Sequence, residues 1–149
     1  MKIIIDTRET KAFTFSRINP RPEIIYRGLH TGDYSIDGYE DRIVIERKAL
    51  GDLFSSVGRG RDRLEREFER MSGFDYAALV IEGDLRTIFK NPPYQSAMQP
   101  KAVFRTLLSW SMKYGVYVWP CPGRAFAEKT TYLLLDFWYR HEQEGIWHI

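Results

Sequence analysis

Two acidic residues and a lysine occupy neighbouring segments of the chain that both have the apolar character of strands. Asp33 follows Gly32 at the start of one segment, and Glu46 and Lys48 lie near the end of the next. Carboxylate oxygens are the ligands that Mg²⁺ prefers, with water and phosphate oxygens completing its shell. Such a cation polarises a phosphate and generates hydroxide near neutral pH. A lysine holds the attacking water or offsets charge on the phosphate. These residue types therefore suit metal-dependent hydrolysis of phosphodiesters.

The alternation of side chains along a strand tests whether these groups converge. Successive side chains point to opposite faces of a sheet. Within residues 43–48, the acid and the lysine therefore share one face, and Arg47 lies on the other. Within residues 33–36, Asp33 and the serine share a face, and the tyrosine and isoleucine share the opposite one. We expect one face of the sheet to carry the chemistry and the other to carry the core.

The connection between the two segments decides whether the acids meet. A two-residue turn at Asp37-Gly38 would put Asp33 opposite Arg42. Glu46 would then lie four residues away, roughly 13 Å at about 3.3 Å per residue. That distance is too long for one shared ion, whose ligand bonds are about 2 Å. The chemistry therefore predicts a longer loop over residues 37–42, which brings Asp33 close to Glu46.

An ordered series of motif residues extends well beyond this pair. It comprises Gly32, Asp33, Glu46, Arg47, Lys48 and Asp52. The series resembles the G-D…E-R-K-x-x-x-D signature of the XPF family of structure-selective DNA endonucleases, a branch of the PD-(D/E)XK nucleases. The likeness continues upstream, where an apolar run ends in Asp6 followed by Arg8-Glu9, and downstream to the strand-like run 78–83. It covers roughly residues 1–90.

The resemblance implies a role for each of these residues. Asp33 and Glu46 would bind Mg²⁺ or Mn²⁺ with the backbone carbonyl of Arg47, and Asp6 would bind it directly or through water. Lys48 would position the nucleophilic water. The catalytic set is therefore Asp33, Glu46, Lys48 and Asp6, with Arg8, Glu9 and Asp52 in supporting positions.

A glycine- and arginine-rich segment follows the signature. Residues 58–66 carry four arginines, and Leu64, Phe68 and Met71 recur at the spacing of a buried helical stripe. Arginines at the start of a helix suit phosphate groups, so we predict that Arg59, Arg61 and Arg63 contact the DNA backbone. For Arg63, the alternative is a solvated helix face with Glu–Arg pairs four residues apart.

The remaining patterns predict a three-layer α/β fold of the restriction-endonuclease-like type, with a central mixed sheet flanked by helices. Strands are expected near residues 2–6, 23–27, 33–36, 43–48, 78–82 and 116–119. Helices are expected near residues 49–57, 61–72, 84–89, 100–114 and 124–142. We expect residues 1–149 to form a single XPF-type nuclease domain without the helix-hairpin-helix units that the family usually carries.

Composition sets broad limits on this interpretation. The chain has 149 residues, 44% of them apolar, which is enough for one packed domain. A single cysteine, Cys121, excludes an internal disulfide and a cysteine-rich zinc site, which favours an intracellular protein. It would be cytoplasmic in a prokaryote or virus and nuclear in a eukaryote. No apolar run approaches the roughly 20 residues that cross a bilayer.

The sequence therefore predicts a divalent-metal-dependent endodeoxyribonuclease. By resemblance its substrate would be branched DNA, such as flaps, forks and junctions, in repair or recombination, and it would form a homodimer or heterodimer. Two alternatives stay open. One is a non-catalytic DNA-binding subunit with a nuclease-like fold, and the other is a restriction- or repair-type nuclease that acts on plain duplex.

Overall fold

Six runs rich in β-branched residues form one sheet in the computed structural model, which describes residues 1–148. The strands are β1 (Lys2–Ile5), β2 (Glu23–Tyr26), β3 (Tyr34–Ile36), β4 (Ile43–Ala49), β5 (Tyr76–Glu82) and β6 (Tyr117–Pro120). Their order across the sheet is β2-β1-β3-β4-β5-β6. The short β3 runs antiparallel to β1 and β4, and the other neighbouring pairs are parallel. The sheet is therefore mixed, as predicted.

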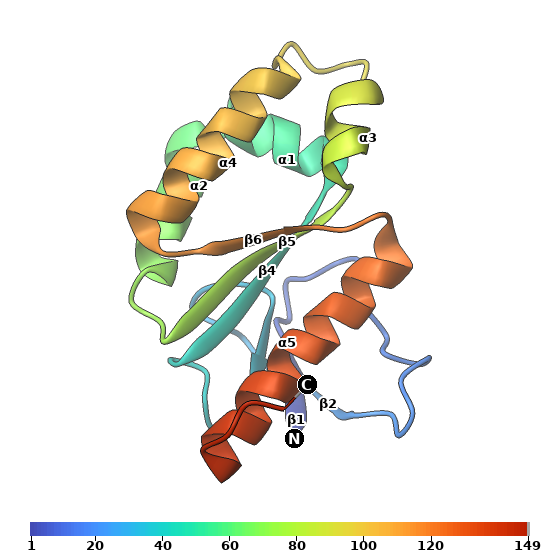
Figure 1. Ribbon diagram of the computed structural model, residues 1–149, viewed down its shortest axis with the longest axis vertical. Coiled ribbons are helices and arrows are strands. Elements are labelled where there is room, and N and C mark those ends of the chain that lie inside the picture. The colour runs from blue at the N-terminus through green and yellow to red at the C-terminus, as the bar shows by residue number, and fades with distance from the viewer. Residues whose placement is uncertain (149) are drawn as a thin grey trace.

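Helices cover both faces of this sheet (Figure 1). They are α1 (Leu50–Val57), α2 (Arg61–Met71), α3 (Leu85–Lys90), α4 (Pro100–Tyr114) and α5 (Arg124–Glu144). The first four lie on one side of the sheet, and α5 lies on the other. Every predicted strand and helix is present, and no boundary differs from its prediction by more than 2 residues. The predicted three-layer α/β architecture is confirmed.

The sheet has a hydrophobic core on each face, so the division into one chemical face and one core face was wrong. Ile43 and Ile45 pack toward α5 in the first core, with Leu135 among its helical residues. Val44, on the opposite face of β4, packs with Leu53 and its neighbours in the second core. Both faces of this sheet are therefore largely apolar, as is usual for parallel sheets, and Ser35 and Glu46 are exceptions within the strands.

The loop between β3 and β4 has the predicted length. Tyr39 donates its N–H to the Ile36 carbonyl, and Arg42 donates to the Tyr39 carbonyl, at 2.8 and 2.9 Å. The strands then pair with Tyr34 opposite Ile45. This register excludes the two-residue turn and places Asp33 beside Glu46.

A buried ion-pair network connects four parts of the fold behind β4. The guanidinium of Arg47 makes two 2.9 Å hydrogen bonds to Glu9, which follows β1, and one to Glu82 at the end of β5. Arg124, the first residue of α5, also binds Glu82 and reaches the carbonyl of Ala12. The side chains of Arg47 and Glu9 are each only 6% exposed. The network therefore fixes the chain after β1 and the start of α5 against the central strands.

No helix among the described residues has both the length and the apolar character needed to cross a membrane.

The network generates a prediction about stability. Replacing Arg47→Met leaves the carboxylates of Glu9 and Glu82 buried without their main partner, so the free energy of unfolding should fall by about 3–5 kcal/mol. Urea unfolding measures this loss. The matched control is Arg66→Met on the exposed side of α2, where we expect a change of about 0.5 kcal/mol or less. Equal effects from the two variants would contradict the structural role of Arg47.

Candidate active site

Three acidic residues meet where β1, β3 and β4 lie side by side. Asp6 directly follows β1, Asp33 directly precedes β3, and Glu46 lies within β4. Because β3 is antiparallel to both neighbours, its first residues meet the final part of each. Asp6 accordingly donates its N–H to the carbonyl of Asp33 at 2.8 Å. Residues separated by up to 40 positions are thus brought to one end of the sheet.

The turn before β3 explains why a glycine precedes the first acid of the signature. Gly32 has a φ of +78°, and a Cβ built there would lie 2.1 Å from Cγ2 of Val44. Only glycine allows both the left-handed backbone and this close approach to β4. Asp33 then donates its N–H to the Ile45 carbonyl, and its Oδ2 accepts the Arg47 N–H at 2.8 Å. The Asp33 carboxylate is therefore held against β4.

Glu46 and Lys48 point from β4 into the same cavity as Asp33, and Arg47 points away from it. Glu46 is only 7% exposed, and the Nζ of Lys48 lies 3.5 Å from its carboxylate. The cavity has a volume of about 530 Å³. Its acidic lining residues are Asp6, Asp33, Glu46 and Glu67, and its basic ones are Arg8, Lys48, Arg59, Arg63 and Arg70.

Burial disfavours the charged forms of the two central acids, and the charges of neighbouring acids add to this effect. Burial raises the pKa of Asp33 from 3.8 to about 6, with the charges of Glu9 and Glu67 adding to it and the Arg47 amide opposing it. Burial, followed by the charges of Asp33 and Glu67, raises the pKa of Glu46 well above 4.5, against the attraction of Lys48. A cation bound between the carboxylates would remove this repulsion.

The donor set fits a divalent cation that keeps much of its water. Asp33 and Glu46 provide two carboxylates on adjoining strands, and Mg²⁺ is commonly bound through one or two carboxylates plus water and phosphate. Among residues 1–148, no group of three or more His, Cys, Asp or Glu side chains is arranged to hold a metal ion. Of the metal ligands predicted from the sequence, only the carboxylates of Asp33 and Glu46 are therefore candidates for direct ligation by side chains.

Asp6 is close to this pair but engaged elsewhere. Its Oδ1 accepts the Leu29 N–H at 2.8 Å, and its Oδ2 accepts a hydrogen bond from Arg8 Nε at 3.0 Å. These contacts fix the segment after β2 beside the cavity. Of the two modes predicted for Asp6, contact through water suits this position better than direct ligation.

The structure does not bring three of the predicted residues to the cavity. Glu9 lies behind β4 in the ion pair with Arg47. Asp52 is exposed on α1 and is not among the cavity-lining residues. Arg61 points toward α4, where it donates to Thr106 Oγ1 at 3.0 Å and lies over the Trp110 ring. These positions favour structural or solvent-exposed roles for all three.

Glu67 and Arg70 line the cavity and were not among the predicted site residues. With Arg63 they form a stripe on α2 at positions i, i+4 and i+7. That stripe flanks the buried residues Leu64 and Phe68. The helical spacing contained this signal, but the sequence did not specify which flank of the helix faces the sheet.

The fold and the site together define an α/β domain with acids gathered where strands of a mixed sheet meet. The model of the ERCC4 domain matches residues 5–134, and the chain belongs to this family as an XPF-type nuclease domain. No match to a curated protein was found.

Two solved structures share the fold. XPF from Aeropyrum pernix superposes with a TM-score of 0.72 at 21% identity, covering 100% of this chain and 65% of that one. XPF from Aeropyrum pernix in complex with DNA gives 0.68 at 20% identity, covering 97% and 66%. The chain thus spans about two thirds of the length of the XPF chains that it resembles.

The raised pKa values of the two acids predict an unusual pH dependence of stability in the presence of chelator. Because the folded-state pKa of Asp33 is raised from 3.8 to about 6, its stabilising contribution is complete below the lower value and is lost as pH rises through the higher one. Glu46→Gln removes one repelling charge, so it should raise the melting temperature at neutral pH and flatten the pH dependence. Thermal unfolding in chelator from about pH 4 to about pH 7 covers this window.

The control for that experiment is Glu69→Gln, an exposed acid on α2 that does not line the cavity. It should leave the pH profile of the melting temperature as in the wild type. A Glu46→Gln profile that also matches the wild type would show that the carboxylates do not repel one another.

Proposed function

We propose that this protein is a DNA endonuclease that requires Mg²⁺ or Mn²⁺ and cuts branched DNA such as flaps, forks and junctions. The observation that carries the proposal is the convergence of Asp33, Glu46 and Lys48 in one cavity whose rim is arginine-rich. Membership of the ERCC4 domain family supports the same reaction class. One of the two solved structures that share the fold is XPF from Aeropyrum pernix in complex with DNA, which supports action on DNA.

Each residue has a task that follows from its position. Asp33 and Glu46, with the backbone carbonyl of Arg47, would hold the cation, and Asp6 would contact it through water. The cation would supply charge to polarise the scissile phosphate and lower the pKa of water. Lys48, at 3.5 Å from Glu46, is placed to orient the attacking water and to offset charge on the phosphate.

The arginines suit a substrate recognised through its backbone. Arg63 and Arg70 come from α2, Arg59 comes from the segment that joins α1 to α2, and Arg8 also lines the cavity. Contacts of this kind set affinity and salt dependence without reading bases. Recognition would then depend on DNA shape, which is consistent with branched substrates.

A homodimer or heterodimer is part of the proposal. On α5, Trp138 is buried against the sheet, although Phe126 is exposed. Three exposed apolar side chains on α4 and β6, Leu108, Met112 and Tyr117, line one common cavity. We therefore place the candidate dimer surface on α4 and β6.

Cleavage tests the proposal directly. Glu46→Ala should abolish cutting while leaving the melting temperature within a few degrees, as for a change of about 1 kcal/mol or less. The assay uses labelled duplex, single-stranded, flap, fork and four-way substrates with Mg²⁺, Mn²⁺ or chelator. Glu69→Ala is the control and should cut as the wild type does.

The outcomes of this panel separate the candidate functions. Cutting of plain duplex as fast as of branched DNA would favour a restriction- or repair-type nuclease. Binding of DNA without cutting under any metal condition would indicate a non-catalytic subunit. Wild-type cleavage by Glu46→Ala would refute the assignment of the site.

Salt dependence tests the arginine contacts. On duplex DNA, each phosphate contact contributes about 0.9 to the slope of log affinity against log salt. Arg59→Ala combined with Arg63→Ala should therefore flatten the slope by roughly two units and weaken all sequences alike. The control is Arg66→Ala on the same helix but outside the cavity lining, which should leave a slope near that of the wild type. If the double variant keeps the wild-type slope, the DNA follows another path.

A further inference from the structure

A second cavity adjoins the catalytic one on the other side of α1. It has a volume of about 790 Å³ and lies between α1 and the loop that joins α3 to α4, residues 91–99. Ser55 and Arg59 line both cavities. A ligand chain that passes Arg59 can therefore continue from one cavity into the other.

The chemistry of this cavity differs from that of the catalytic one. The lining combines apolar side chains, Phe54 and Met98, with polar Ser55 and Gln95. Arg59 is its single charged lining residue among those that the structure describes, and no carboxylate lines it. A surface of this kind accepts sugars, base faces and a negatively charged backbone.

Packing holds the loop in place as the outer wall. A Cβ at Gly58 would lie 2.9 Å from Cγ of Met98, so the loop rests directly on the end of α1. Ser96 donates its N–H to the Pro93 carbonyl at 3.0 Å, and its Oγ accepts the Met98 N–H at 3.1 Å. The wall is therefore a packed structure with internal hydrogen bonds.

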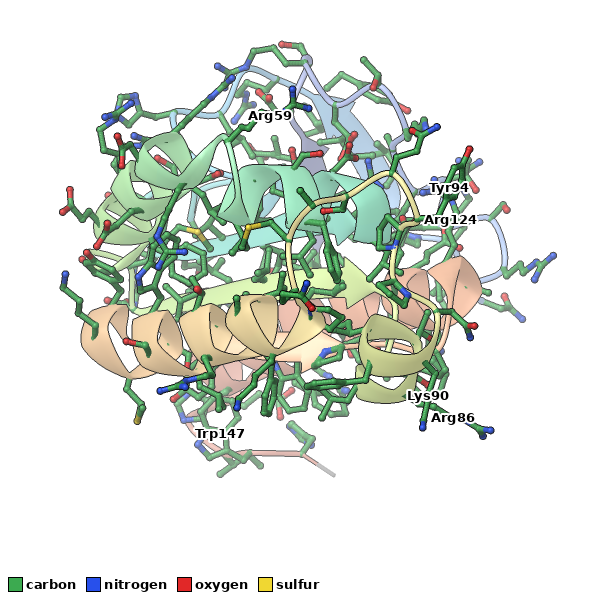
Figure 2. All side chains as sticks on the ribbon, turned by 90° about the horizontal axis from the view of Figure 1, so that it is seen from above. Arg59, Arg86, Lys90, Tyr94, Arg124 and Trp147 are labelled. Atoms are coloured by element: carbon green, nitrogen blue, oxygen red, sulfur yellow. The ribbon has the colours of Figure 1, made fainter. Side chains whose placement is uncertain are left out.

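Tyr94 belongs to the loop that forms this wall, although its own side chain does not line the cavity. It lies between the lining residues Pro93 and Gln95 and is 91% exposed, more than any other large hydrophobic side chain described. Gln95 Nε2 donates to its hydroxyl at 2.9 Å. In the view of Figure 2, Tyr94 lies toward the same edge of the molecule as Arg86 and Lys90 but apart from them, and well away from Trp147. An exposed ring at the edge of a cavity that an arginine, Arg59, lines is a combination that suits unpaired nucleic acid.

We propose, resting on the nuclease function above, that this second cavity receives an unpaired DNA strand leaving the catalytic cavity, with Tyr94 stacking on one of its bases. Bases inside a duplex have both faces covered by their neighbours, so an isolated exposed ring selects an unpaired base. Arg59 binds the phosphate between the two cavities. The site thereby distinguishes a branched substrate from plain duplex at the position of cleavage.

The test compares Tyr94→Ala with Tyr94→Phe, which keeps the ring. Binding is measured by fluorescence anisotropy in chelator, on a forked duplex with one unpaired arm and on a blunt duplex of the same sequence. Tyr94→Ala should weaken binding of the fork by roughly 5- to 150-fold, the range of one base–aromatic stack. Its affinity for blunt duplex should not change, and Tyr94→Phe should bind the fork as the wild type does.

The matched control is Trp147→Ala, which removes an exposed aromatic ring elsewhere and should change neither affinity. The inference is overturned if Tyr94→Ala binds the fork normally, if it weakens fork and duplex equally, or if Trp147→Ala has the same effect. Normal fork binding by Tyr94→Ala, with cleavage still abolished by Glu46→Ala, would remove this inference and leave the nuclease function standing. If the wild type neither binds nor cuts any DNA, both proposals fail.

Discussion

The antiparallel register between β3 and β4 is the constraint on which the site depends. Gly32 brings the chain so close to β4 that a side chain there would overlap Val44, and Asp33 then binds β4 through its N–H and its carboxylate. A slip of one residue would turn Glu46 and Lys48 to the opposite face. The pairing of Tyr34 with Ile45 therefore determines which acids meet, and the glycine of the signature is as necessary to the geometry as the acids.

Alternation along β4 places functional and stabilising side chains on opposite faces of the strand. Glu46 and Lys48 face the catalytic cavity, and Arg47, between them, faces the other way. Burial and the charge of Asp33 disfavour the charged form of Glu46, which makes this pair of acids a source of instability. Arg47, on the other face, forms a buried network with Glu9 and Glu82 that joins the chain after β1 to β5. Natural sites often contain such strain, and the surrounding structure compensates for it. Here the compensating interactions are those of Arg47, the residue next to Glu46 in β4.

The sequence predicted the strands and the acids that they carry because both depend on local patterns. Asp33, Glu46 and Lys48 could be placed from strand alternation and one distance argument. Arg61, Glu67 and Asp52 could not, because their roles depend on how helices rotate against the sheet. Arg61 is held by Thr106 and Trp110, residues of a helix about 45 positions away, and nothing in residues 58–66 indicates that contact. Glu9 was identified from its place in the order of the family motifs. That it forms an ion pair with Arg47 became apparent only from the structure.

The short segment joining α1 to α2 links the two cavities and therefore the two proposed steps of recognition. Gly58 allows Met98 to pack on the end of α1, and Arg59 directly after it borders both cavities. Asp33 and Glu46 come from the sheet and its immediate flank, whereas Arg59, Arg63 and Arg70 come from α2 and the segment just before it. A nucleic-acid backbone that binds these arginines would lie over Asp33 and Glu46. A strand that continues past Arg59 would then enter the second cavity, which no carboxylate among residues 1–148 lines. The charge distribution thus favours a path along α1 toward Tyr94 for any DNA that enters the catalytic cavity.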